Sequence, residues 1–186
     1  MATTAIVYDI SGSSPSAQTL TGGHNFRFQI ANSLTTGDGA TAISIQFVNA
    51  STSDAFHIGR AAIGIESTTT GSDYTGPPTD ITFNTGDATV TISTAGSVWS
   101  DYITFSWSTS VHYLIHIKTE TTNEGLSYIS AVASYGAYKQ TTIDETTVID
   151  TTGYLNLARV YLVQQIKAET SSVGGGTTGN LFFAHG

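Results

Sequence analysis

The sequence predicts an all-β protein with little helix, and three observations indicate it. Apolar and polar residues alternate in many short segments, which is the pattern of half-buried strands. Thr and Ser supply 32 and 21 of the 186 residues, and Gly supplies 19. Thr is β-branched and fits a pleated surface, whereas Ser and Gly favour the turns between strands.

About ten segments show this alternation, and turn-forming residues separate them. In the segment at 24–30, Phe26, Phe28 and Ile30 fall on one face, and polar residues that include Arg27 fall on the other. We therefore expect two apposed layers with apolar inner rows and polar outer walls. In chain order, the predicted strands are 24–30, 43–47, 56–65, 81–83, 90–92, 99–107, 111–118, 127–138, 141–149 and 155–166.

Glycine and proline mark the turns between these strands. NTGD at 84–87 predicts a hairpin between the fourth and fifth strands. Gly59 and Gly64 lie inside a predicted strand, where they indicate a bulge or the close approach of another segment. The longest loop, 67–78, ends in two prolines that cannot continue a ladder.

The last predicted strand has an alternative. In GYLNLARVYLVQQIKAET (153–170), Leu155, Arg159, Leu162 and Ile166 would share one face of a helix. Alternation over the same residues fits a strand that is buried on both faces equally well. We favour the strand, because a lone helix would have no partner layer in an otherwise all-β chain.

The stretch SVWSDYITFSWSTSVHYLIHIK (97–118) gathers tryptophan, histidine and aspartate in two adjacent strands. The odd-numbered residues of the first strand face the core. We therefore expect Trp107 to be buried and Trp99, at the start of the strand, to stand partly exposed. We expect Asp101 to cap a turn by accepting backbone N–H groups, and a role in ligand or metal binding is its alternative.

His112 and His116 are four residues apart, which is a metal-binding spacing on a helix. On a strand, at about 3.3 Å per residue, the two rings lie about 13 Å apart and cannot share one ion. We therefore expect HYLIH to be a solvated or subunit-facing sheet surface.

The residue types favour a protein without catalytic machinery. The chain has no Cys, which excludes disulfides, thiolate zinc sites and cysteine nucleophiles. No histidine lies beside a carboxylate in a recognisable signature, and EF-hand loops are absent from the sequence. We expect no enzyme activity and no cofactor, whereas a structural calcium held by backbone carbonyls and scattered Asp residues stays open.

The charge content limits the classes of partner. Charged residues make up 11% of the chain, far below the roughly 25% of ordinary soluble domains. The net charge is −8, and the six Lys and Arg residues form no cluster in the sequence. Binding to phosphates requires neighbouring cations, so we expect no nucleic-acid binding and no docking on an anionic membrane. No segment approaches the roughly 18 apolar residues that cross a bilayer.

The compartment follows from composition and the N-terminus together. The hydroxyl-rich surface is typical of proteins that work outside cells, yet the N-terminus shows no signal peptide. A virion component reconciles these two features, because it is made in the host cytoplasm and leaves by lysis or packaging. An intracellular protein that is rich in Thr is the alternative.

The two ends of the chain supply candidate contact peptides. The predicted division is a β-sandwich domain at 1–170, a Gly-rich linker at 171–179 and an apolar contact peptide at 180–186. The last peptide either packs on its own domain or docks on another chain. The residues expected to contact partners are Leu181, Phe182, Phe183, Ile6 and Tyr8.

Four pieces of the first 135 residues share a pattern with a known family. They are QTLTGGHNFRFQIAN (18–32), SIQFVNAS (44–51), HIGRAAIGI (57–65) and DITFNTGDATVTISTAGSVWSDYITF (80–105). Together they resemble the N-terminal β-sandwich domain that precedes the catalytic domain in some bacterial SGNH (GDSL-like) hydrolases. Related modules occur in phage tail and capsid-associated proteins.

This resemblance implies a jelly-roll-like sandwich in the style of carbohydrate-binding modules, without the enzyme. The hydrolase family has a Gly-Asp-Ser nucleophile motif, whereas this chain has only GDG at 37–39 and GDA at 86–88. The family's final Asp-x-x-His has no counterpart near the end of this sequence, and the one match to that pattern is DAFH at 54–57.

We therefore expect a structural or adhesive virion protein: capsid decoration, a head fibre or a tail fibre. Its expected partners are other capsid or tail proteins and further copies of itself, for which fibres suggest a trimer. A free carbohydrate-binding module that recognises a host surface glycan is the alternative. The glycan-contact candidates are Trp99, Tyr74 and Tyr113.

Overall fold

The computed structural model describes residues 3–21, 23–68, 72–120, 124–130, 135–141, 143–150, 152–156 and 159–170. Within these ranges the chain forms fifteen strands and one short 3-10 helix, η1 (Asn32–Leu34). The all-β, sandwich-like architecture that the sequence predicts is confirmed. Its jelly-roll connectivity stays a prediction.

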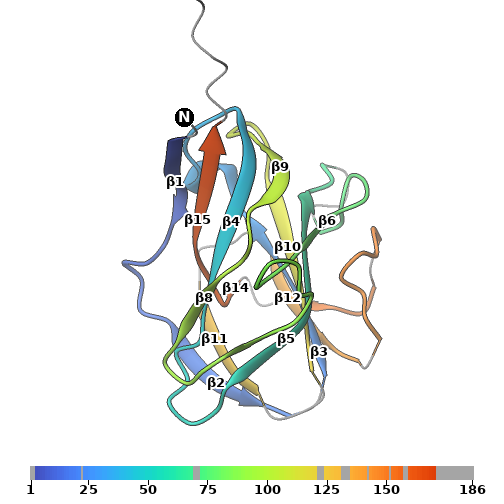
Figure 1. The fold of residues 1–186 in the computed structure, drawn as a ribbon. Coiled ribbons are helices and arrows are strands. Elements are labelled where there is room, and N and C mark those ends of the chain that lie inside the picture. Colours follow the sequence, from blue (N-terminus) through green and yellow to red (C-terminus); the bar gives the residue numbers. More distant parts are fainter. Residues whose placement is uncertain are drawn as a thin grey trace, which may run out of the picture.

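Three antiparallel sheets make up the fold (Figure 1). The β4 sheet contains β1 (Thr3–Asp9), β15 (Val163–Thr170) and β4 (Ala40–Val48), with β8 (Ser97–Trp99) and β9 (Ile103–Trp107) in succession along β4. The β3 sheet contains β13 (Leu155–Asn156), β12 (Gly136–Gln140), β3 (His24–Ile30), β10 (Tyr113–Thr119) and β5 (Phe56–Ile65), with β6 (Thr79–Ile81) and β7 (Val90–Ile92) along β5. The small sheet contains β14 (Arg159–Tyr161), β11 (Glu124–Ser130) and β2 (Ser16–Leu20).

The predicted apolar rows meet in one core. Phe26, Phe28 and Ile30 of β3 are at most 1% exposed, as the alternation of 24–30 predicts. Ile45 and Phe47 of β4 are fully buried in the same cluster. Burying one such side chain contributes about 1.5–3 kcal/mol, so these rows account for much of the stability of the fold.

The two glycines inside β5 have the roles that the sequence predicts. The ladder between β10 and β5 skips Gly59, because Lys118 pairs with Arg60 and Thr119 with Ile58. A Cβ on Gly64 would lie 2.6 Å from Cδ1 of the Tyr74 ring. Gly59 therefore marks a bulge and Gly64 a close approach.

The predicted hairpin around NTGD is wrong in its pairing. A tight turn is present, with a bridge from Phe83 to Asp87 and a positive φ of 122° at Gly86. However, β6 and β7 pair with β5 rather than with each other. β6 and β7 are therefore two parts of one interrupted edge strand beside β5, and the NTGD turn lies between them.

Three predicted strands are each divided in the structure. The strand at 99–107 breaks at Ser100, whose Oγ accepts the N–H of Ile45 at 2.9 Å in place of a backbone carbonyl. The segment 127–138 spans β11 and β12, which belong to different sheets. The segment 155–166 divides among β13, β14 and β15, and Leu162 takes a positive φ of 62° between the last two.

The outer wall of the β3 sheet also differs from the prediction. The sequence predicts a strand at 141–149, but the described residues of that segment form turns that lie over this wall. Arg27 on β3 and His116 on β10 are consequently fully buried. The polar rows of these strands face a covered layer and not solvent.

Candidate functional site

Two of the three predicted glycan contacts lie in the interior. Tyr74 is 2% exposed, and its ring lies 4.6 Å from the guanidinium carbon of Arg27. Tyr113 is fully buried and stacks on Trp107 with ring centroids 4.5 Å apart. Its hydroxyl donates to the carbonyl of Ser108 at 3.1 Å. A sugar would not reach either ring in this structure, so the prediction that Tyr74 and Tyr113 contact a glycan is wrong.

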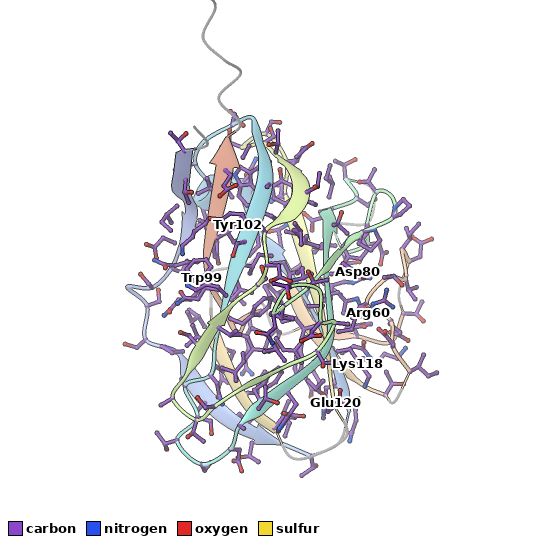
Figure 2. The ribbon with its side chains drawn as sticks, viewed as in Figure 1. Arg60, Asp80, Trp99, Tyr102, Lys118 and Glu120 are labelled. Carbon is purple, nitrogen blue, oxygen red and sulfur yellow. The ribbon has the colours of Figure 1, made fainter. Side chains whose placement is uncertain are left out.

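Trp99 is the predicted glycan contact that stays near the surface. Its ring is half-buried on β8, where Figure 2 labels it beside Tyr102. The ammonium Nζ of Lys167 lies 3.6 Å from the ring centroid. A sugar that stacks on this face would have to displace Lys167, so the platform is already occupied by a cation–π contact.

The two predicted N-terminal contact residues lie on different sides of β1. Ile6 is 41% exposed and is available to a partner. Tyr8 is 1% exposed and belongs to the core, so the prediction that Tyr8 contacts a partner is wrong. Leu181, Phe182 and Phe183 lie outside the described residues, and their role stays a prediction.

The Asp101 prediction is confirmed. Its Oδ1 accepts the N–H of Thr85 at 2.9 Å, and its Oδ2 accepts the N–H of Gly86 at 2.9 Å. These bonds hold the NTGD turn and lower the pKa of the Asp101 carboxyl. Asp101 therefore has a structural role.

The HYLIH prediction is correct at one histidine and wrong at the other. The His112 side chain is 41% exposed, whereas His116 is fully buried. The Nη2 of Arg27 lies 3.3 Å from His116 Nδ1, and the Tyr154 hydroxyl lies 2.8 Å from Nε2. Burial and the charge of Arg27 hold the pKa of His116 well below 6.5.

His116 belongs to a buried arginine cluster, which we define as Arg27, Asp73, Tyr74, His116 and Tyr154. Arg27 pairs with Asp73 at 3.0 Å. Its guanidinium also donates to the carbonyls of Ser72, Val148 and Ile149 at 3.1, 2.6 and 3.3 Å. The cluster fastens the covering segments to the β3 sheet, which is a structural function.

A groove beside β5 holds a second carboxylate and histidine. Glu66 Oε2 accepts a hydrogen bond from Gln29 at 2.5 Å and lies 3.9 Å from His112 Nδ1. Burial raises the pKa of the Glu66 carboxyl. Tyr135 and Ser110 complete one wall. Both Glu66 Oε1 and His112 Nδ1 are shielded from solvent, so a ligand in the groove would not reach them directly.

A cleft with different chemistry lies between the small sheet and the β3 sheet. It has a volume of about 350 Å³, within the range of small-molecule sites. We call it the inter-sheet cleft. Its lining residues are Gln18, Leu20, His24, Phe26, Leu126, Tyr138, Gln140, Arg159 and Tyr161.

The register of the sheets brings these side chains together. Tyr161 on β14 packs its ring 4.8 Å from Phe26 on β3, and the ring of His24 lies 6.0 Å from Tyr138 on β12. Gln18 and Gln140 are exposed at the rim. The cleft therefore has buried aromatic rings below it, the half-buried ring of Tyr138 in its wall and carboxamides at its mouth.

Arg159 is the charged residue of the cleft wall. Its guanidinium carbon lies 3.9 Å from the ring centroid of Tyr128, which holds the side chain in place. Among the described residues, no carboxylate lies within 4 Å of Arg159 and none lines the cleft. Burial raises the pKa of the neighbouring Tyr161 phenol, which stays protonated.

The sequence could not reveal this cleft. Its residues come from β2, β3, β11, β12 and β14, so no local motif contains them. One residue stands out in the sequence: if 153–170 formed a helix, Arg159 would be the polar residue on its apolar face.

The sequence was compared with family models and with curated proteins. No family model matches the sequence, and no curated protein matches it. In the part of the chain that the structure describes, no helix is long and apolar enough to cross a membrane. Within that same part, no three His, Cys, Asp or Glu residues lie together as a metal site.

Proposed function

We propose that this chain is a non-enzymatic structural or adhesive component of a phage or phage-like virion, as capsid decoration, a head fibre or a tail fibre. It binds other capsid or tail proteins and further copies of itself. The hydroxyl-rich composition and the resemblance of the first 135 residues to phage-associated sandwich modules support this proposal.

The observation that carries it is the exposed start of β1. Thr4, Ala5 and Ile6 are exposed, and β1 lies at the edge of the β4 sheet, where it pairs with β15. No charged residue and no Pro interrupts 3–8, but the end of this stretch is already paired, because Tyr8 bridges to Thr35 and the Val7 carbonyl accepts the N–H of Thr36 at 2.8 Å. The edge that a partner could use is therefore the exposed start of the strand. Natural edge strands usually carry such interruptions, because an uninterrupted edge can accept a strand from another chain.

The test is association with particles. Lysates that contain the chain are fractionated on a density gradient, and the chain is followed by immunoblotting. We expect the chain in the particle band, and Ile6→Lys should move most of it to the soluble fraction. Ile143→Lys is the matched control, because Ile143 is 65% exposed on another part of the surface. A wild-type chain that stays in the soluble fraction would overturn the proposal.

A free carbohydrate-binding module is the second candidate function. The inter-sheet cleft favours it, because aromatic faces together with carboxamide donors and acceptors suit a polyhydroxylated ligand. On a particle, repeated copies of such a module would also increase the avidity for a host surface glycan.

A further inference from the structure

The inter-sheet cleft has a charge that is unusual for this protein. The chain carries 14 acidic and six basic residues, yet the described cleft wall contains Arg159 and no carboxylate. Three other basic side chains pair with acids: Arg27 with Asp73 at 3.0 Å, Arg60 with Asp80 at 2.9 Å and Lys139 with Glu145 at 2.6 Å. Arg159 instead stacks on Tyr128, which leaves its N–H donors without a carboxylate partner among the described residues.

The remaining side chains indicate what accompanies the charge. The half-buried Tyr138 presents part of its ring, whereas Tyr161 is 1% exposed and belongs to the core. Gln18 and Gln140 each carry both a donor and an acceptor. Gln140 already donates to the carbonyl of Thr21 at 3.2 Å, so its amide is oriented at the rim. A ligand that fits this set has an apolar ring face, several hydroxyls and one anionic group.

We propose that the inter-sheet cleft binds an acidic saccharide, with Arg159 paired to the sugar carboxylate and the two glutamines bonded to its hydroxyls. The planar guanidinium matches a carboxylate with two parallel hydrogen bonds. The half-buried ring of Tyr138 packs against the C–H face of the sugar. This inference rests on the second candidate function and names its ligand class.

The experiment uses two pairs of saccharides that differ in one charge. Calorimetry of the full chain compares sialyllactose with lactose, and trigalacturonate with its methyl ester. We expect at least one acidic member to bind about ten-fold more tightly than its neutral partner, which is the effect of one charge-assisted bond. Binding of inorganic phosphate at the same affinity would overturn the saccharide assignment, because it would show a simple anion site.

Variants test the named residues. Arg159→Gln should abolish the preference for the acidic member, and Gln18→Ala, an exposed change, should weaken both members. Arg60→Gln is the matched control, because Arg60 is bound to Asp80 on the outside of the β3 sheet at 2.9 Å. Circular dichroism shows whether each variant folds.

Three outcomes would overturn the inference: no binding of any acidic member at millimolar concentration, equal binding of acidic and neutral members, or Arg159→Gln binding like the wild type. Particle association of the wild-type chain is measured separately. A wild-type chain that joins the particles but binds no acidic saccharide overturns this inference alone, whereas one that binds the acidic saccharide but stays in the soluble fraction overturns the virion proposal alone.

Discussion

Arg27 is the residue on which the outer layer of the β3 sheet depends. Its guanidinium is fully buried, and it joins Asp73 to three carbonyls of the covering segments. A buried charge is stable only where partners replace its water, so the contribution of this group depends on the whole set of contacts.

We expect Arg27→Met to lower the free energy of unfolding by about 3–5 kcal/mol, because Asp73 and the carbonyls would lose their partner inside the protein. Arg60→Met is the matched control. Arg60 makes a two-pronged bond to Asp80 through Nε and Nη2, and Figure 2 labels the two residues near each other. Their side chains are 35% and 52% exposed. That change should cost about 0–1 kcal/mol. Urea unfolding measures both values, and equal losses would contradict the assignment.

The contacts of His116 assign its proton. A guanidinium can only donate, so Nδ1 accepts from Arg27 and the neutral ring carries its proton on Nε2, toward Tyr154. A second proton on Nδ1 would face the N–H of Arg27. Burial, and after it this conflict with Arg27, lowers the pKa of His116.

The lowered pKa predicts a pH dependence of stability. Below the ordinary histidine pKa of 6.5, the unfolded chain binds a proton that folded His116 does not bind. The free energy of unfolding of the wild type should therefore fall as the pH drops from about 7 to about 5. In His116→Gln this part of the decline should be absent. Urea unfolding at a series of pH values measures it, and parallel curves would contradict the buried neutral imidazole.

At the level of elements, alternation predicted where strands occur better than where they end. The strands at 24–30 and 56–65 are found with their predicted bounds, and 24–30 also has its predicted core face, because one long ladder buries one complete row. The breaks at Ser100 and Leu162 depend on a side-chain hydrogen bond and a positive φ, which periodicity does not encode. Pairing between distant strands is likewise a property of the assembled fold, so the inter-sheet cleft could not be predicted.

Gly64 tests the packing of loop 67–78 on β5. Gly64→Ala would place a methyl group 2.6 Å from Cδ1 of the buried Tyr74 ring, so we expect a loss of about 1–3 kcal/mol in the free energy of unfolding. Gly76→Ala lies in the same loop with no atom within 4 Å of the added carbon, and it should change stability by no more than about 0.5 kcal/mol. Thermal or urea unfolding distinguishes them. A neutral Gly64→Ala would show that the Tyr74 ring moves aside readily.

For the whole molecule, the few cations are used mainly to join segments that are distant in sequence. The six basic side chains contact Asp73, Asp80, the Thr141 carbonyl, Glu145, the Tyr128 ring and the Trp99 ring. The contacts of Arg27, Lys118 and Lys139 tie a strand of the β3 sheet to a loop, whereas those of Arg60, Arg159 and Lys167 each lie within one sheet. No basic side chain is therefore left over to form a positive patch among the described residues, and the net charge of the chain is −8. Contacts with a partner would therefore depend on hydroxyl, apolar and backbone groups more than on positive charge.

The C-terminal peptide gives the prediction that decides between self-packing and docking. Residues 180–186 lie outside the described part, and the prediction comes from the apolar Leu181, Phe182 and Phe183 behind a Gly-rich linker. If the peptide docks on another chain, replacing Phe182 and Phe183 by Ser should lower the particle-bound fraction in the density gradient and leave the melting temperature unchanged. Asn180→Ser, in the same peptide, is the control and should alter neither measurement. A lowered melting temperature with full particle association would show instead that the peptide packs against its own domain.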